Sequence, residues 1–129
     1  IEGNCYMVIT ILCNSKDISI RLAELIDETN NGVSFFSAFS YTEAINCLGK
    51  HKADIVLLDF DFAENDTVQL LKWIKKNSVE TVVMVLYSLA GELRIKQFRD
   101  CGADYLFDKY NDFEKIAPVI KTICKAVSF

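Results

Sequence analysis

Short apolar runs alternate along the chain with segments whose apolar residues recur at helical spacing. The runs are rich in Val, Ile, Leu and aromatic residues, which is typical of strands buried on both faces of a sheet. Five strands are therefore predicted at Tyr6–Cys13, Val33–Phe39, Ala53–Asp59, Thr81–Tyr87 and Ala103–Phe107. The third and fourth runs are the most apolar, which predicts that they lie at the centre of the sheet.

Helices are expected between and after these strands, because apolar residues there share one helical face. The first helix carries Ile18, Leu22, Leu25 and Ile26, and the last carries Phe113, Ile116, Ile120 and Ile123. Polar residues could cap three of the helices: Ser40 with Glu43 as a capping box, Asn65 or Asp66 before a helix that runs through Lys76, and Asp112 before the fifth. Pro118 falls inside the fifth helix, where its missing N–H is expected to loosen or kink the early turns.

Strands and helices that alternate in this way predict an α/β fold with right-handed crossovers. The expected architecture is a doubly wound five-stranded parallel sheet in the order 2-1-3-4-5, with helices on both faces. Ligands of such sheets bind beyond the carboxyl ends of the strands. The positions to inspect are therefore Cys13–Asn14, Asp59, Tyr87–Ser88 and the stretch that reaches Lys109.

The composition is that of a globular protein, with 51% hydrophobic and 25% charged residues among 129. We expect a single domain over residues 1–129, with residues 1–6 either an expression tag or a frayed terminus. The domain either stands alone or is part of a longer protein. Acidic residues outnumber basic ones by 18 to 14, which disfavours direct nucleic-acid binding. No apolar run approaches the roughly 20 residues of a membrane span, so a soluble, cytoplasmic domain is expected.

The cysteines are five, widely spread and without a Cys-x-x-Cys pair. We therefore expect all five to be reduced structural thiols rather than metal ligands or disulfides.

Asp59 ends a fully apolar strand, which delivers its carboxylate to the carboxyl edge of the sheet. A carboxylate there could attack a phosphoryl group and hold it as an acyl phosphate, if cations offset the gathered charge. Lys109, at the end of the fifth run, could supply one such cation. From the local residues alone, a capping role for Asp59 is an equally good interpretation.

Two strings favour the first interpretation. Ala53-Asp54-Ile-Val-Leu-Leu-Asp59-Phe-Asp61, followed later by Gly102-Ala103-Asp104-Tyr105-Leu-Phe-Asp108-Lys109, resembles the third and fifth strands of the response regulator receiver family. The resemblance implies that Asp59 is the phosphoacceptor, that Lys109 pairs with the phosphate, and that the Asp61 backbone carbonyl helps to hold Mg²⁺.

The same resemblance implies a signalling domain rather than an enzyme. Its phosphoryl donor would be a histidine kinase or phosphotransfer protein. Its signal would pass to a downstream protein partner or to an output domain outside this chain. A homodimer through the fourth and fifth helices is plausible by analogy.

The metal-binding positions depart from the family pattern. The first strand ends in Cys13 and Asn14, where the family has two acidic residues. Mg²⁺ prefers carboxylate and carbonyl oxygens, so Cys13 offers it little. Asn14 could remain a weak ligand and Asp17 lies nearby, but Mg²⁺ binding is expected to be weakened or lost.

The switch positions depart as well. At the end of the fourth strand the family places a Ser or Thr, and counting back from Lys109 puts Tyr87 at this position. Tyr is too large to swing inward as a small hydroxyl would, so either Ser88 takes the role through a shift of one residue or the relay is absent. The aromatic switch position holds Leu106, and Tyr105 beside it should face the other side of the sheet. Ala63 and Thr67 stand where the family usually carries Pro and Gly in the loop after the phosphoacceptor. Tyr110 stands where Pro often follows the lysine.

Three hypotheses follow. The first is a receiver that is phosphorylated on Asp59. The second is a pseudo-receiver that acts as a phosphorylation-independent protein-interaction module, as Cys13, Asn14 and Tyr87 suggest. The third is a flavodoxin-like ligand-binding enzyme, which is disfavoured because Asn14–Asp17 lacks the glycines of a phosphate-binding loop. Trp73 is expected to be a packing or surface aromatic.

Overall fold

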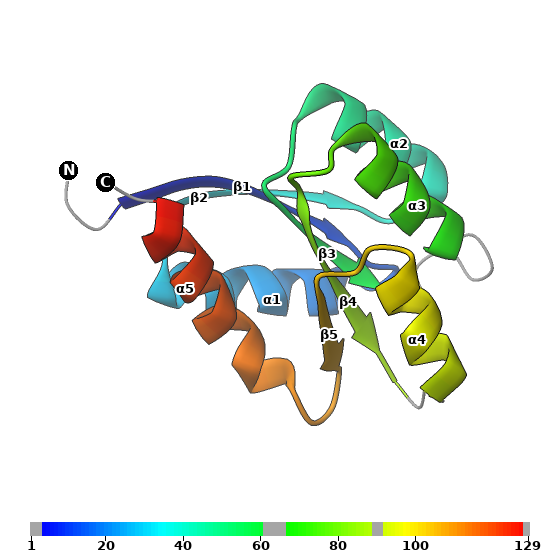
Figure 1. Ribbon diagram of the computed structural model, residues 1–129. Helices are drawn as coiled ribbons and strands as arrows, with labels where there is room; N and C mark the ends of the chain where they lie inside the picture. The colour runs from blue at the N-terminus through cyan, green and yellow to red at the C-terminus, as the bar shows by residue number, and fades with distance from the viewer. Residues whose placement is uncertain (1–3, 61–66, 89–91, 128–129) are drawn as a thin grey trace.

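The sheet of this protein, seen in a computed structural model, has five parallel strands in the order β2-β1-β3-β4-β5 (Figure 1). The structure describes residues 4–60, 67–88 and 92–127. The strands are β1 Asn4–Leu12, β2 Asn31–Ala38, β3 Ile55–Asp59, β4 Val82–Tyr87 and β5 Tyr105–Asp108. The predicted fold class and strand order are confirmed, and β3 and β4 occupy the central region as expected.

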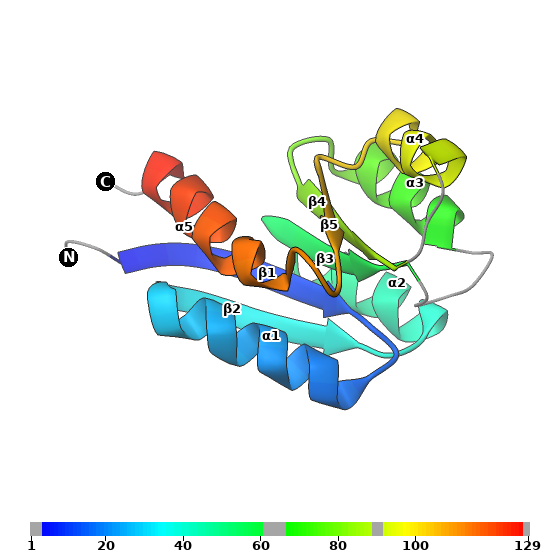
Figure 2. The ribbon, with the colours of Figure 1, turned by 90° about the horizontal axis from the view of Figure 1, so that it is seen from below.

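The helices cover both faces of the sheet (Figures 1 and 2). They are α1 Lys16–Thr29, α2 Tyr41–Lys50, α3 Thr67–Asn77, α4 Glu92–Asp100 and α5 Ile116–Val127, with a short 3-10 helix, η2, at Phe113–Lys115. One buried cluster joins α1 and α5 to the sheet, and a second joins α2, α3 and α4 to the opposite face. In β3, Ile55 and Leu57 belong to the first cluster whereas Val56 and Leu58 belong to the second, as the alternation of a strand requires.

The start of α2 shows the expected cap. The Ser40 hydroxyl accepts a hydrogen bond from the Glu43 N–H at 3.2 Å, and the Glu43 carboxylate accepts one from the Phe39 N–H at 3.1 Å. This arrangement satisfies donors that the first turn of a helix leaves unpaired. The alternative caps Asn65 and Asp66 lie outside the described residues.

The start of the last helix differs from the prediction. Asp112 does not cap it, because its carboxylate turns back and accepts a hydrogen bond from the Asp108 N–H at 2.9 Å. Pro118 lies in the first turn of α5, where an N–H has no partner within the helix, so no kink is required. A short 3-10 turn, η2, precedes α5 at Phe113–Lys115.

The cysteines divide into two groups. Cys13, Cys47 and Cys101 are free thiols, as predicted. Cys124 is disulfide-bonded, so the expectation of five reduced thiols is wrong for this residue. The side chain of Cys5 lies outside the described residues. The prediction failed because wide spacing in the sequence does not exclude a pair that the fold brings together.

Among the described residues, no helix combines the length and the apolar character that crossing a membrane requires.

Candidate functional site

Asp59 lies at the carboxyl end of β3 with only 1% of its surface exposed. All five residues of this strand are buried, and the strand carries the carboxylate to the carboxyl edge of the sheet. The backbone there is fixed, because the Phe60 N–H donates to the Leu86 carbonyl at 2.8 Å and continues the ladder with β4. A buried carboxylate needs a hydrogen bond or a positive charge nearby.

Lys109 supplies the positive charge. Its Nζ lies 2.7 Å from Asp59 Oδ1, and its side chain is 16% exposed. The lysine directly follows β5, and its N–H donates to the Tyr87 carbonyl at 2.8 Å. Asp108 fixes the next residues, because its carboxylate accepts hydrogen bonds from the Tyr110 and Asn111 N–H groups. The two residues that the sequence singled out are thus brought together.

Cys13 contacts the other oxygen of the same carboxylate. Its Sγ lies 3.6 Å from Asp59 Oδ2, and the residue is 1% exposed. The Ser15 N–H donates to the same sulfur at 3.4 Å. Burial raises the pKa of the Cys13 thiol, and the negative charge of Asp59 raises it further, whereas the Ser15 hydrogen bond acts in the opposite direction. The thiol is therefore protonated at neutral pH and donates its hydrogen to Asp59.

These contacts do not fit the Mg²⁺ that the resemblance implies. One oxygen of Asp59 faces an ammonium group and the other faces a thiol, whereas Mg²⁺ requires oxygen ligands. Within residues 4–60, 67–88 and 92–127 there is no group of three or more His, Cys, Asp or Glu side chains that could hold a metal. Asn14 and Asp17 are exposed, and Asp61 lies outside the described residues.

The two candidates for the switch hydroxyl, Tyr87 and Ser88, lie at different places relative to Asp59. Tyr87 packs against the cluster on the α2, α3 and α4 side. Asp59 lies on the other face, because it is two residues beyond Leu57 in the same strand. Tyr87 therefore points away from the phosphoacceptor position, while Ser88 lies in the bend that directly follows β4. Leu106 packs on the same side as Tyr87. Tyr105 lies on the other side, as the sequence predicted, and stacks there with Phe107.

A hollow of about 540 Å³ opens over the pair. Asp59 and Lys109 line it together with Arg21 from α1 and Phe113 from η2. The Arg21 guanidinium lies 5.0 Å from the centre of the Phe113 ring, a cation–π contact that holds its charge at this hollow. Sequence reasoning missed Arg21, because its approach to Asp59 depends on the packing of α1 beside the last helix. Lys109 and Arg21 are the positive groups with which an anion can pair in this hollow, and Asp59 and Glu114 are the acidic groups of the same lining.

Fold and site together define a doubly wound α/β domain with an aspartate–lysine pair at the carboxyl edge of its sheet. The family model described as response regulator receiver domain matches residues 9–121, and the chain belongs to this family.

Among curated proteins, the chain is similar to sporulation initiation phosphotransferase F of Bacillus subtilis (strain 168), with 28% identity over 116 residues that cover 88% of this chain and 90% of the relative. Solved structures share the fold. The receiver domain of a DNA-binding response regulator from Colwellia psychrerythraea 34H matches with a TM-score of 0.85 and 19% identity over 92% of this chain and 98% of the other. The Mn²⁺-bound form of response regulator Rcp1 matches with a TM-score of 0.80 and 17% identity over 95% of this chain and 98% of the other.

Proposed function

We propose that this receiver domain accepts a phosphoryl group on Asp59. The observation that carries the proposal is the buried ion pair between Asp59 Oδ1 and Lys109 Nζ at 2.7 Å, beside a hollow large enough for a phosphoryl group. In the reaction, an Asp59 oxygen forms a bond to phosphorus, and the bond from phosphorus to the donor breaks. Lys109 then moves its charge from the carboxylate to the phosphoryl oxygens.

The donor is a histidine kinase or a phosphotransfer protein, in which the bond that breaks joins phosphorus to an imidazole nitrogen. The departing imidazole takes a proton and leaves as the neutral side chain. The similarity to a protein named a phosphotransferase supports this class of donor. In this role the domain is a signalling component rather than an enzyme with its own small-molecule substrate.

In this proposal, phosphorylation of Asp59 depends little on a divalent cation. A site with three carboxylates and one lysine needs a metal to balance its charge, but here Asp59 faces Lys109 and an uncharged thiol. Replacement of a carboxylate by Cys13 therefore removes both an oxygen ligand and a negative charge. Binding of Mg²⁺ is weakened or lost as a result.

Ser88 takes the role of the switch hydroxyl, because Tyr87 packs on the opposite face of the sheet. Phosphorylation modestly shifts the populations of two conformations of the domain. That shift changes the affinity of the surface around α4 and α5 for a downstream protein partner or an output domain outside this chain. A homodimer through this same surface is a further expectation by analogy.

The test is the intact mass of the protein after incubation with acetyl phosphate or phosphoramidate. The expected adduct is one phosphoryl group on the wild type, formed in Mg²⁺ and to a similar extent in EDTA, and missing from Asp59→Asn. The matched control Asp54→Asn alters the aspartate that directly precedes the same strand and should still form the adduct. An adduct that survives in Asp59→Asn would contradict the assignment.

The second candidate is a pseudo-receiver that works as a protein-interaction module without phosphorylation. The hydrogen bond from the Cys13 thiol to Asp59 favours it, because it occupies a carboxylate oxygen that a nucleophile must leave free. The same mass measurement separates the two functions. No adduct on the wild type, from either donor and with or without Mg²⁺, would make the pseudo-receiver the better account.

A further inference from the structure

A second hollow, of about 520 Å³, lies at the edge of the sheet opposite Asp59. Its walls come from the last residues of α2 and α3, which lie side by side in Figure 1, and from the loop that leads into β4. Its volume falls within the range of about 300–1,000 Å³ that small-molecule sites occupy. The hollow is separate from the phosphoacceptor site, since the two lie at opposite ends of the parallel strands.

One wall offers an aromatic surface and open space. Trp73, the only tryptophan in the chain, is half-buried on α3 and lines the hollow. Val79 beside it is 75% exposed. Gly49 of α2 faces them, and a Cβ atom built on it would meet no atom within 4 Å. A flat apolar group therefore has both a surface to stack on and room to enter.

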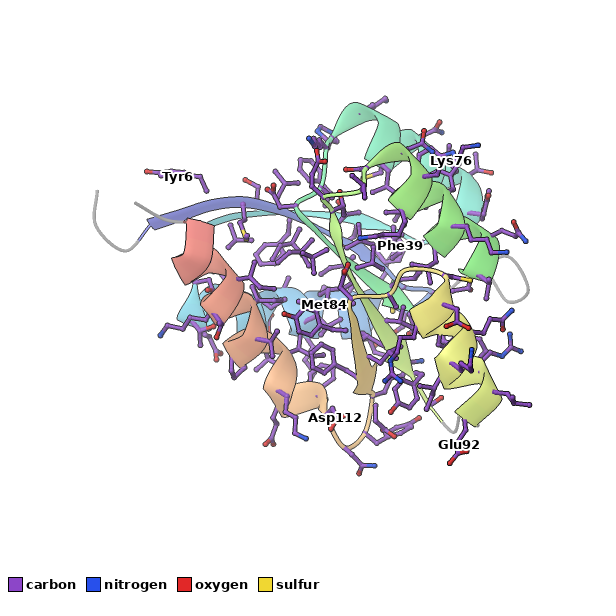
Figure 3. The ribbon with its side chains drawn as sticks, in the orientation of Figure 1. Tyr6, Phe39, Lys76, Met84, Glu92 and Asp112 are labelled. Atoms are coloured by element: carbon purple, nitrogen blue, oxygen red, sulfur yellow. The ribbon has the colours of Figure 1, made fainter. Side chains whose placement is uncertain are left out.

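The rim is positively charged in a protein with a net charge of −4. It carries Lys50, Lys52 and Lys76, with Glu80 as the one acidic residue of the lining. Lys52 and Glu80 form an exposed ion pair at 2.7 Å and cancel each other, which leaves the other two lysines. Figure 3 shows Lys76 on α3, on the side where α3 lies beside α2.

Helix dipoles reduce this charge but do not remove it. α2 ends at Lys50 and α3 ends at Asn77, and each carboxyl end contributes roughly −0.5 elementary charge. Two such ends offset about one of the two remaining lysines. The rim thus keeps a positive charge beside an aromatic wall, a combination that suits a ligand with a planar ring and an acidic group.

We propose that this hollow, which we call the Trp73 pocket, is a binding site for a small aromatic anion. The ring lies against Trp73 and Val79, and the carboxylate, sulfonate or phosphate pairs with Lys50 and Lys76. Neither residue of the phosphoacceptor pair takes part, so the proposal does not depend on phosphorylation of Asp59.

The probe is 1-anilinonaphthalene-8-sulfonate, an aromatic anion, and binding is followed by quenching of the single tryptophan. Its matched control is N-phenyl-1-naphthylamine, which has the same rings and no sulfonate. The anion should bind the wild type and quench Trp73, while the neutral amine should bind several-fold more weakly. Equal binding of the two compounds, or no binding of the anion, would overturn the proposal.

Substitutions in the lining test whether the anion binds in the Trp73 pocket. Gly49→Phe fills the open space from a helical position and should abolish quenching, while Gly49→Ala should retain most of it. Lys50→Gln and Lys76→Gln should each weaken the affinity by about fivefold, the effect of about 1 kcal/mol from one exposed ion pair. Lys121→Gln removes an exposed lysine from α5, on the other face of the sheet, and should change nothing.

The near-UV circular dichroism of each variant checks that it is folded. If Gly49→Phe does not fold, the double variant Lys50→Gln/Lys76→Gln decides, with an expected loss of more than tenfold. Quenching that stays unchanged in folded Gly49→Phe or in this double variant would place the ligand elsewhere and contradict the proposal.

Discussion

Asp59 is held between a charged donor and an uncharged one, and this contrast determines what its site can bind. Lys109 balances the carboxylate, so the pair is neutral without a metal. The Cys13 thiol adds a hydrogen bond but neither a charge nor an oxygen ligand. The identity of residue 13 should therefore control the affinity of the site for divalent cations.

Cys13→Asp should restore that affinity. The substitution places a second carboxylate within about hydrogen-bond distance of Asp59, and two carboxylates so close favour a divalent cation. We expect Mg²⁺ and Mn²⁺ to bind at least about tenfold more tightly than to the wild type, a gain of about 1.4 kcal/mol. Isothermal titration calorimetry with Mn²⁺ measures the gain.

Cys13→Ser is the matched control for this gain. It replaces the thiol with an uncharged hydroxyl, which supplies an oxygen but no negative charge, so it should gain much less cation affinity than Cys13→Asp. If Cys13→Asp gained no affinity, or if Cys13→Ser gained as much, the thiol would not be the reason for weak metal binding.

The thiol also predicts how stability depends on pH. Burial raises the pKa of Cys13 in the folded state, while the unfolded chain loses this proton near its ordinary pKa of about 8.5. Above that pH the unfolded state binds fewer protons than the folded state, so the free energy of unfolding should fall as pH rises. Burial raises the pKa of Cys47 as well, which adds to the same trend.

Urea denaturation between about pH 7.5 and 9.5 tests this dependence. The free energy of unfolding should be constant at the lower end and fall toward the upper end. Cys13→Ser keeps only the part due to Cys47 and should show a smaller fall. An equal or steeper fall in Cys13→Ser would show that other groups cause the trend.

Single residues were predictable from the sequence when their role follows from their place in a strand. Asp59 and Lys109 became candidates because they lie at the ends of the third and fifth apolar runs, and the resemblance to the receiver family then implied their roles. The structure brings the two side chains together. The direction of Asp112 was not predictable, since its carboxylate accepts from the N–H of Asp108, four residues before it, and not from the helix that follows. The contact between Arg21 and Phe113 joins residues far apart in the sequence, and no local pattern indicates it.

Among the elements, the turn between α4 and β5 depends on one glycine. Gly102 has a φ of +109°, which a residue with a side chain adopts only with strain. A Cβ atom there would also lie 2.8 Å from Cγ of Lys75. The lysine cannot move aside without loss, because its Nζ donates to the Thr81 carbonyl at 2.7 Å and pairs with Asp104 at 3.0 Å.

Gly102→Ala should therefore lower the free energy of unfolding by roughly 1–3 kcal/mol through strain and lost hydrogen bonds. Gly49→Ala is the matched control, since its added methyl group meets no atom within 4 Å and lies inside α2. That control should raise stability by about 0.5–1 kcal/mol. Urea denaturation measures both, and a loss in Gly49→Ala equal to that in Gly102→Ala would exclude local strain as the cause.

The elements themselves were the most predictable level. Every predicted strand overlaps an observed one, and the boundaries differ by no more than three residues. The Trp73 pocket could not be predicted, because it requires the carboxyl ends of α2 and α3 to lie together. Trp73 lies at helical spacing with Leu70, and this pattern indicates a packed residue but not the hollow beside it.

Across the whole molecule, the ion pair between Asp59 and Lys109 ties the carboxyl end of β3 to the end of β5. β4 lies between these two strands, so the pair bridges three strands of the sheet. Its two members are buried to different degrees, with side chains 1% and 16% exposed. Removal of one partner should therefore not have the same effect as removal of the other.

Lys109→Met leaves the Asp59 carboxylate, whose side chain is only 1% exposed, without its lysine, and loss of one member of a buried pair costs about 3–5 kcal/mol. Asp59→Asn leaves a lysine that can extend toward the hollow and become hydrated, so its cost should be smaller. The double variant removes the uncompensated charge and should be more stable than Lys109→Met alone.

Lys96→Met is the control, because it breaks an exposed pair with Asp100 and should change stability by no more than about 0.5 kcal/mol. Urea denaturation of the four variants at pH 7 gives the order, and equal losses in Lys109→Met and Asp59→Asn would show that Asp59 is not held as a buried charge.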